Sequence, residues 1–272
     1  MSSLAGKVVV VTGCTRGFGR VLVAMLAERG ARLVVSGPWA DEAEEQATAL
    51  RALGVDAVAT GCDVTDADEV EALADLAVAT WGRVDVWVNN AAASNPVGRA
   101  FDLDPGEFRR AIEVNALGTY HGTRAAVTRM AGTGGVVVNI LGRGDNAGAT
   151  PYTTAYGATK AWVAGFTASV RKEYADSGVR LVGFNPGMML TEKLTGAHAV
   201  GEAGERMMKP FAKVQEVFAD PPEVAAQRLV AVLEKDRPPA KVNLIGPIGA
   251  GRHAVRFAGR KVRGVGARRE AR

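Results

Sequence analysis

The sequence predicts a single doubly wound α/β domain, a three-layer αβα sandwich built on about seven parallel strands. Short apolar runs alternate with segments of helical periodicity along most of the 272 residues. The first run, Val8–Thr12, is almost wholly apolar and leads into a glycine, as expected of a strand buried on both faces. The helical segments after the first two strands stop at Gly30 and Gly54, and glycine commonly follows a helix C-terminus.

The remaining elements follow the same alternation. Apolar side chains at helical spacing predict a helix over Gly17–Arg29, and they are Phe18, Val21, Leu22, Met25 and Leu26. Further strands are expected at Arg32–Ser36, Val55–Thr60, Val84–Asn89, Val136–Ile140, Val179–Phe184 and Lys241–Ile245. Further helices are expected at Asp41–Leu53, Asp66–Thr80, Pro105–Met130, Ala155–Ser177 and Pro222–Glu234. Strands joined through helices run parallel, and such sheets bind ligands beyond the carboxyl ends of their strands.

The segment Leu190–Asp220 departs from this alternation. It is mixed in composition and rich in Met and Gly, so we expect residues 190–220 to fold over the site as a lid. No internal repeat, linker or change of composition divides the chain. We therefore predict one catalytic domain over residues 1–246, followed by a basic C-terminal tail over residues 247–272.

The composition excludes several classes of protein. Hydrophobic residues make up 47% of the chain and charged residues 23%, which is typical of a globular protein. No apolar run approaches the ~18 residues of a membrane span, and the N-terminus lacks the pattern of a signal peptide. The two cysteines, Cys14 and Cys62, and the three histidines show no metal-binding spacing. We therefore expect no metal and a reducing, cytoplasmic location.

The net charge of +4 is concentrated at the C-terminus. From Pro247 onward eight basic residues face one acid, so this tail carries +7 and the rest of the chain −3. A mildly acidic body argues against a nucleic-acid partner. Four arginines of the tail have the spacing of one helix face, which fits peripheral contact with an anionic membrane surface or an acidic partner. They are Arg252, Arg256, Arg260 and Arg263. The alternative is a solvated chain terminus.

A glycine-rich turn lies between the first predicted strand and the first predicted helix. Gly13, Gly17 and Gly19 stand where the backbone must turn sharply or approach a ligand closely. The helix N-terminus offers unpaired N–H groups and a positive dipole end to a pyrophosphate. This context favours a dinucleotide-binding turn, and the alternative is a tight turn without a ligand.

Tyr156 and Lys160 stand four residues apart at the start of a predicted helix, so their side chains share one face. Reduction of a carbonyl needs a proton donor beside the oxygen. A free tyrosine has a pKa of about 10 and exchanges protons poorly at neutral pH. We expect the lysine ammonium to favour the phenolate and lower the pKa of the tyrosine.

These motifs resemble the short-chain dehydrogenase/reductase family of classical type. The likeness extends from about Lys7 to Thr191 and includes three further segments. They are Cys62-Asp63-Val64, Asn89-Asn90-Ala91-Ala92 with alanine in place of the family's glycine, and Pro186-Gly187 followed by Thr191. The resemblance implies a Rossmann-type fold and NAD(P)-dependent hydride transfer between nicotinamide and a carbonyl or hydroxyl group of a small molecule. A sensor or structural protein that binds NAD(P) but is catalytically weak is the alternative.

The resemblance also implies roles for single residues. Tyr156 is the expected acid/base and Lys160 its electrostatic partner, which also binds the ribose. Asn115 is the expected support of a water relay, or else makes a structural hydrogen bond within its helix. The residues expected to bind the cofactor are Gly13, Thr15, Arg16, Gly17, Phe18, Gly19, Asp63, Val64, Asn90, Ala91, Ile140, Tyr156, Lys160, Pro186, Gly187, Met189 and Thr191.

The choice of cofactor depends on the end of the second strand. NAD enzymes usually place an acid there to hold the ribose 2′-hydroxyl, and residues 36–39 contain none. Arg16 is placed to meet a 2′-phosphate, so we expect NADP(H) in preference to NAD(H). A solvent-facing arginine is the alternative.

The sequence departs from the family at the active-site serine, about thirteen residues before the tyrosine. Gly142 or Arg143 occupies that place. A serine there would donate a hydrogen bond to the substrate oxygen. Loss of one such oxyanion donor lowers kcat on the order of 10²–10³-fold in enzymes where it has been tested. The candidates for its replacement are Asp145, Asn146, Thr150 and Thr153.

The glycine-rich stretch before Tyr156 is similar to that of the chlorophyll b reductase branch of the family, which implies a bulky, apolar substrate with a carbonyl. Side chains expected to line its pocket, or else to pack the lid, are Met188, Met189, Leu190, Met207 and Met208. By analogy with the family, the helices near Pro105–Met130 and Ala155–Ser177 form the interface of a homodimer or homotetramer.

Overall fold

A computed structural model describes residues 3–244 of the chain. Within this part, seven parallel strands form one sheet in the order β3-β2-β1-β4-β5-β6-β7. The strands are β1 Val8–Val11, β2 Arg32–Gly37, β3 Ala57–Gly61, β4 Val86–Asn89, β5 Gly135–Ile140, β6 Val179–Asn185 and β7 Lys241–Asn243. The predicted doubly wound sheet is therefore confirmed. The predicted basic tail and the end of the last predicted strand, Ile245, lie outside the described residues.

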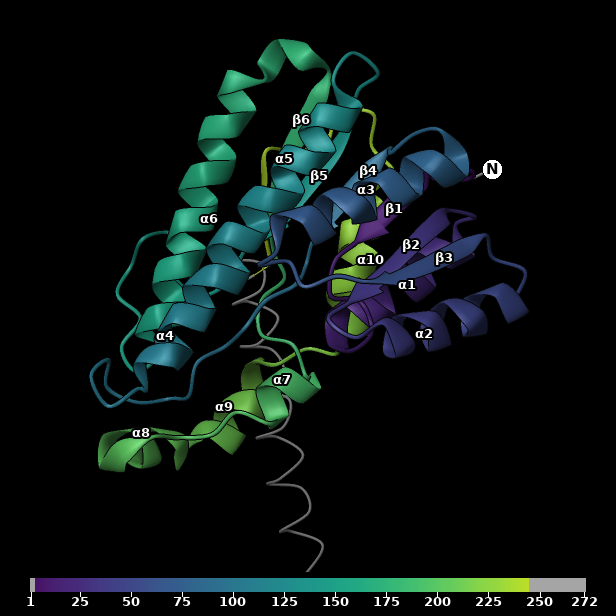
Figure 1. Ribbon diagram of the computed structural model, residues 1–272. Helices are drawn as coiled ribbons and strands as arrows, with labels where there is room; N and C mark the ends of the chain where they lie inside the picture. The colour runs from purple at the N-terminus through teal and green to yellow at the C-terminus, as the bar shows by residue number, and fades with distance from the viewer. Residues whose placement is uncertain (1–2, 245–272) are drawn as a thin grey trace, which may run out of the picture.

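The strands are buried because their side chains alternate between two apolar cores. Val9 and Val11 of β1 face a core with α1 Gly17–Glu28, α2 Ala40–Ala52 and α10 Pro222–Leu233. Val8 and Val10 face a second core with α3 Ala67–Trp81, α5 Gly118–Met130 and α6 Thr154–Glu173. All four valines are fully buried, so an apolar run without polar alternation is what this layered arrangement requires. Figure 1 shows the two helical layers on either side of the sheet.

The helix predicted over Pro105–Met130 is interrupted. It comprises α4 Pro105–Ile112, a π-helical turn η1 at Glu113–Leu117, and α5. The π turn adds one residue to a helical turn, which shifts side chains round the helix and is frequent at functional sites. Asn115 lies within it. Periodicity alone does not reveal such a turn, because the apolar pattern before and after it stays helical.

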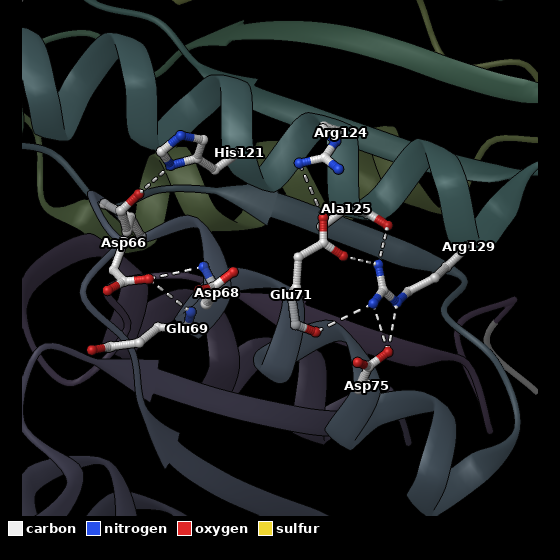
Figure 2. Close-up of polar contacts among 10 residues, drawn as sticks. Asp66, Asp68, Glu69, Glu71, Asp75, His121, Arg124, Ala125 and Arg129 are labelled. Carbon is white, nitrogen blue, oxygen red and sulfur yellow. Dashed lines mark hydrogen bonds and ion pairs between the residues drawn. The ribbon is translucent and has the colours of Figure 1, made fainter.

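A network of charged side chains ties α3 to α5 on the second face of the sheet (Figure 2). Arg129 of α5 donates to the Glu71 carboxylate at 2.6 Å and to Asp75 at 2.5 Å, and also to the carbonyl oxygens of Glu71 and Ala125. Its side chain is only 15% exposed. Arg124, one helical turn earlier, approaches Glu71 at 3.7 Å and is 57% exposed. Arg129 thus makes the shorter and more buried polar contacts between these two helices.

The predicted lid contains three short helices: α7 Glu192–Thr195, α8 Gly201–Met208 and α9 Phe211–Phe218. A bridge between Met189 and Asp220 closes the segment at its base. A second bridge joins Val97, in the segment after β4, to Ala199. The lid is therefore attached to the domain at the carboxyl edge of the sheet, where Figure 1 shows it below the strands.

Membrane-spanning and metal-binding features were sought among residues 3–244. No helix there is long and apolar enough to cross a membrane, and no cluster of three metal-ligating side chains occurs. Cys14 and Cys62 are free, buried thiols. Burial raises the pKa of each to about 12, so neither is a reactive thiolate at neutral pH. A short 3₁₀ turn, η2 Ala175–Ser177, ends the region predicted as one helix with α6.

Candidate active site

The glycine-rich turn joins β1 to α1 at the carboxyl edge of the sheet. Gly13 has a φ of 60°, and a Cβ there would lie 2.8 Å from the Ala91 Cα. A Cβ at Gly19 would lie 2.6 Å from Asn90 Nδ2, which donates to the carbonyl oxygens of Thr12 and Gly13 at 2.9 and 2.7 Å. Because neither site has room for a side chain, glycine is needed for the turn to pack on the segment after β4. The structure thus brings these predicted cofactor residues together.

The N-terminus of α1 faces this turn without a capping side chain. Arg16 is the N-cap residue and makes no side-chain cap hydrogen bond, whereas Asp66 and Asp104 cap α3 and α4. Backbone N–H groups near Gly17 are therefore available to an anion. The Phe18 side chain is 5% exposed and lies in the core, so only its backbone can serve a ligand.

The end of β2 forms one side of the cleft. Thr15 is buried against Gly37, where a Cβ would lie 2.7 Å from Thr15 Cγ2. Arg16 is exposed, and its guanidinium carbon lies 5.7 Å from the centre of the Trp39 ring. The stretch from Ser36 to Trp39 brings no carboxylate to this edge.

Asp63 and Val64, predicted at the adenine, shape the loop after β3. The Asp63 carboxylate accepts hydrogen bonds from the backbone N–H and hydroxyl of Thr65 at 3.0 and 2.9 Å. Val64 is buried against Gly118 of α5, and its carbonyl oxygen lies 3.0 Å from His121 Nδ1. Both residues thus fix the loop after β3.

Tyr156 and Lys160 lie on one face of α6, as their spacing predicted. The Lys160 amine donates to the carbonyl oxygen of Ile140 at 2.8 Å and lies 5.6 Å from the centre of the Tyr156 ring. The Tyr156 N–H donates to Asn95 Oδ1 at 2.9 Å, which anchors the start of α6 to the segment after β4. Asn95 is buried and was missed by the sequence analysis because nothing in its local pattern marks it.

The protonation of this pair differs from the expectation. Burial raises the pKa of Tyr156 to about 12, where the sequence predicted a lowered value. Burial and, to a smaller extent, the nearby Lys193 ammonium together lower the pKa of Lys160 to about 7. Desolvation disfavours the charged form of both groups, so it outweighs the attraction between phenolate and ammonium. The tyrosine is therefore a protonated phenol at neutral pH.

Asn115 connects α6 to the segment after β4. Its Oδ1 accepts from the Ala93 N–H at 2.8 Å, and its Nδ2 donates to the Ala93 carbonyl at 2.9 Å and to Thr159 Oγ1 at 3.0 Å. The carbonyl oxygen of Asn115 accepts from Thr119 Oγ1 at 2.7 Å. These side-chain bonds leave the helix instead of staying within it. Asn115 is thus placed to position both neighbours of the site.

Gly142 takes the place expected for the serine, in preference to Arg143. A Cβ at position 142 would lie 2.6 Å from the Tyr156 hydroxyl oxygen. Gly142 is buried, whereas Arg143 is exposed. The phenol therefore occupies the space beside residue 142 that a serine side chain would need.

Two of the four candidates for the serine's role are engaged elsewhere. Asp145 forms an ion pair with Lys241 at 3.0 Å, and its side chain is 6% exposed. Asn146 is exposed and accepts a hydrogen bond from the Gly148 N–H at 3.0 Å. Asp145 is paired with Lys241, and the Asn146 amide faces its own loop. Neither side chain is therefore placed to donate a hydrogen bond near the Tyr156 phenol.

The two threonines among these candidates stabilise the loop before α6. Thr150 packs directly on Gly157 in the first turn of α6. The Thr153 hydroxyl donates to the Thr150 carbonyl at 3.4 Å. The Thr153 hydroxyl therefore serves the local fold, and Thr150 contributes packing against α6.

The segment after β6 approaches the glycine turn from the lid side. The Gly187 N–H donates to Asn185 Oδ1 at 3.0 Å, which fixes the turn after Pro186. Met189 packs against the core that contains α1. A Cβ at Gly17 would lie 3.6 Å from the Cβ of Thr191, so Thr191 stands over the start of α1.

Lys193 also lies in the site and was not predicted. Its amine donates to the Ala92 carbonyl at 3.1 Å and lies 5.1 Å from the centre of the Tyr156 ring. A basic residue two positions after Thr191 is the only sequence signal, and its meaning depends on where the lid folds.

Comparison with known proteins supports this architecture. Residues 7–199, more than half of the chain, match the family model described as short chain dehydrogenase. The chain belongs to the short-chain dehydrogenase family. It is 36% identical over 257 residues to cis-4-hydroxycyclohexanecarboxylate dehydrogenase of Sinomonas cyclohexanicum, covering 93% of this chain and 99% of that one. It is 32% identical over 191 residues to 7alpha-hydroxysteroid dehydrogenase of Escherichia coli K12, covering 70% and 74%.

The resemblance to the chlorophyll b reductase branch is also found. A probable chloroplastic chlorophyll(ide) b reductase of Arabidopsis thaliana is 26% identical over 241 residues, which are 82% of this chain and 47% of that protein. Among solved structures, a metagenomic short-chain oxidoreductase in complex with NADP has a TM-score of 0.72 at 26% identity, covering 89% and 98%. A 3-ketoacyl-(acyl-carrier-protein) reductase of Brucella melitensis complexed with NADH has a TM-score of 0.74 at 28% identity, covering 85% and 92%.

Proposed function

We propose that this chain is an NAD(P)-dependent oxidoreductase that interconverts a secondary alcohol and a ketone. The observation that carries the proposal is the pair Tyr156 and Lys160, which shares one face of α6 at the same sheet edge as the uncapped N-terminus of α1. A proton donor beside a dinucleotide-binding turn is what hydride transfer to a carbonyl requires.

The residues present fit a nicotinamide dinucleotide. The turn at Gly13 and Gly19 has no room for side chains, and the open N–H groups of α1 offer an anion site for a pyrophosphate. Loop residues Asp63 and Val64 stand at the adenosine end, and Thr191 stands at the nicotinamide end. When bound, the dinucleotide supplies or accepts the hydride.

The chain's own residues handle the proton. In the reductive direction the Tyr156 phenol donates its proton to the substrate oxygen, and in the oxidative direction the phenolate takes it back. Lys160, held at the Ile140 carbonyl, binds the ribose and stabilises the phenolate when it forms. Asn115 positions Ala93 and Thr159 around this pair.

The cofactor is NADP(H) in preference to NAD(H). Arg16 is exposed at the edge of the cleft over Trp39, and the end of β2 brings no carboxylate that would repel a 2′-phosphate. A fluorescence titration should show NADPH bound more tightly than NADH. Arg16→Ala should weaken only the binding of NADPH, by roughly tenfold or more, because a hydrogen-bonded charge is lost. Tighter binding of NADH by the wild type would exclude this preference.

The substrate is an alcohol or ketone on a bulky, largely apolar ring. The two bacterial relatives are named for ring alcohols, a hydroxycyclohexanecarboxylate and a hydroxysteroid. A cavity of about 240 Å³ is lined by Arg99, Tyr152, Ala203, Arg206 and Met207. The lining includes one of the predicted methionines but neither Tyr156 nor Lys160, and its two arginines do not favour an apolar ligand. The proposed substrate class therefore rests on the two relatives.

The deciding experiment measures NADPH oxidation with ring ketones and NADP reduction with ring alcohols, both with cyclohexane and steroid skeletons. Tyr156→Phe should lower kcat by roughly 10²–10⁴-fold and leave cofactor binding intact. If the protein binds cofactor but turns over no substrate in either direction, it is a dinucleotide-binding protein instead.

We further propose that the enzyme works in the cytoplasm as a homo-oligomer.

A further inference from the structure

Lys193 extends from the lid towards Tyr156. It is the second residue of α7, and its amine contacts the segment after β4 at the Ala92 carbonyl, 3.1 Å away. The same amine lies 5.1 Å from the centre of the Tyr156 ring. The amine therefore lies near the proposed acid/base Tyr156, although Lys193 as a whole is exposed.

The residues just before Lys193 lie over the glycine turn. A Cβ at Gly17 would lie 3.5 Å from Glu192 Oε2 and 3.6 Å from the Thr191 Cβ. The start of α7 thus covers the N-terminus of α1, and Lys193 stands between this N-terminus and Tyr156.

Three cations follow one another along the cleft. The pKa of Lys193 is lowered to about 8, by burial of the amine and by the Arg16 guanidinium. Lys193 in turn lowers the pKa of Lys160. Thr191 and Glu192 lie over Gly17, and the Lys193 and Lys160 amines lie 5.1 and 5.6 Å from the centre of the Tyr156 ring. These contacts give the order Arg16, Lys193, Lys160. Within residues 3–244, no carboxylate forms an ion pair with Lys193. The Glu192 carboxylate lies over Gly17, but it forms no ion pair with any of the three basic side chains. Like charges without an ion pair are unfavourable by themselves and favour an anionic ligand.

The order of these cations matches the order of groups in a dinucleotide. Arg16 stands at the adenosine ribose and Lys160 at the nicotinamide ribose in the proposed function, and the pyrophosphate joins the two riboses. We propose that Lys193 binds the pyrophosphate of the cofactor and so holds α7 over the cleft. This inference rests on the proposed function. The pyrophosphate would then be bound from two sides, by Lys193 of the lid and by the open N–H groups of α1.

The test compares dissociation constants for NADPH, NADH and ADP-ribose by isothermal titration calorimetry. Lys193→Gln should weaken all three by roughly tenfold or more, because each contains the pyrophosphate and loses a charged hydrogen bond. Lys193→Arg should restore part of the affinity, since it retains the charge. Lys209→Gln is the matched control, because Lys209 is an exposed lysine of the lid immediately after α8, and it should leave all three constants unchanged.

Other outcomes would overturn the inference. An unchanged affinity in Lys193→Gln excludes the contact. A loss confined to NADPH assigns Lys193 to the 2′-phosphate, and a loss that spares ADP-ribose assigns it to the nicotinamide end. A wild-type protein that binds none of the three ligands defeats the proposed function together with this inference, whereas wild-type binding with no effect of Lys193→Gln defeats the inference alone.

Discussion

Gly142 leaves the space that the Tyr156 phenol occupies. A Cβ at this position would lie 2.6 Å from the phenol oxygen and 3.5 Å from Lys160 Cγ. Cores of this density have no free volume to absorb such an overlap, so any side chain here must displace the phenol. The absence of a serine at position 142 and the position of the Tyr156 phenol therefore depend on each other. A donor that assists the substrate oxygen must come from a position other than residue 142.

Substitution of this glycine by alanine tests that interpretation. Gly142→Ala should lower kcat by roughly 10–100-fold, because a reacting group displaced by about 1 Å can lose 10² in rate, and it should leave the Kd for NADPH unchanged. Gly165→Ala on α6 is the matched control, since a Cβ there meets nothing within 4 Å. It should keep kcat and raise stability by up to about 1 kcal/mol. Steady-state kinetics of the two variants decide the matter, and a wild-type kcat for Gly142→Ala would contradict the proposed constraint.

Lys160 should make the stability of the fold depend on pH. Its pKa is lowered to about 7 in the folded chain, and a lysine in the unfolded chain has a pKa of about 10.4. Between these values the unfolded chain binds a proton that the folded chain does not, so the free energy of unfolding rises with pH. The rise begins near pH 7 and is complete near pH 10.5.

The corresponding variant removes the titrating amine. In Lys160→Gln the increase of Tm between pH 7 and 9.5 should be smaller than in the wild type. Lys172→Gln, an exposed lysine on the same helix, should keep the wild-type slope. Thermal unfolding followed by circular dichroism measures all three proteins. Equal slopes in the wild type and Lys160→Gln would show that the amine is not desolvated as described.

Among the helices, α3 and α5 are joined by two arginines, of which Arg129 is the more buried. Arg129 is 15% exposed and bonds to Glu71, Asp75 and the Ala125 carbonyl (Figure 2). Its removal leaves the partly buried Glu71 carboxylate with Arg124 alone, 3.7 Å away, which costs more than the loss of an exposed pair. Arg124 offers an internal comparison, because it approaches the same Glu71 from an exposed position.

Urea unfolding of two alanine variants should separate these cases. Arg129→Ala should lower the free energy of unfolding by about 1–3 kcal/mol. Arg124→Ala should change it by no more than about 0.5 kcal/mol, as expected for an exposed ion pair 3.7 Å apart. A similar small effect of both variants would mean that the network in Figure 2 contributes little to stability.

The layered fold could be predicted because burial on both faces leaves a direct mark on the sequence. Valines of β1 and a glycine-rich turn at its end determine where the sheet and its ligand edge lie. The π turn at Asn115 could not be predicted, because it depends on the fit of α4 and α5 to Ala93 and α6. Lys193 could not be predicted either, since its contacts join segments about a hundred residues apart.

Apolar side chains that remain exposed on α4, the π turn, α5 and α6 lead us to predict that the chain associates with further copies of itself. Ile112, Leu117, Tyr120 of α5 and Trp162 of α6 are each between 41 and 45% exposed. Trp162 stacks on Phe166 with ring centres 4.8 Å apart, so it presents a flat aromatic surface. Apolar side chains gathered over adjacent helices favour association with a second copy, and the predicted interface includes these helices.

Light scattering coupled to size exclusion tests this interface. The wild type should elute as a dimer or tetramer, and Trp162→Glu should shift it to a smaller species because a charge is then desolvated at the contact. Phe101→Glu provides the control, since Phe101 is fully exposed but lies in the loop before α4 and outside this face, and it should leave the assembly unchanged. A monomeric wild type would remove the interface altogether. Dissociation by Phe101→Glu in place of Trp162→Glu would move it towards the lid.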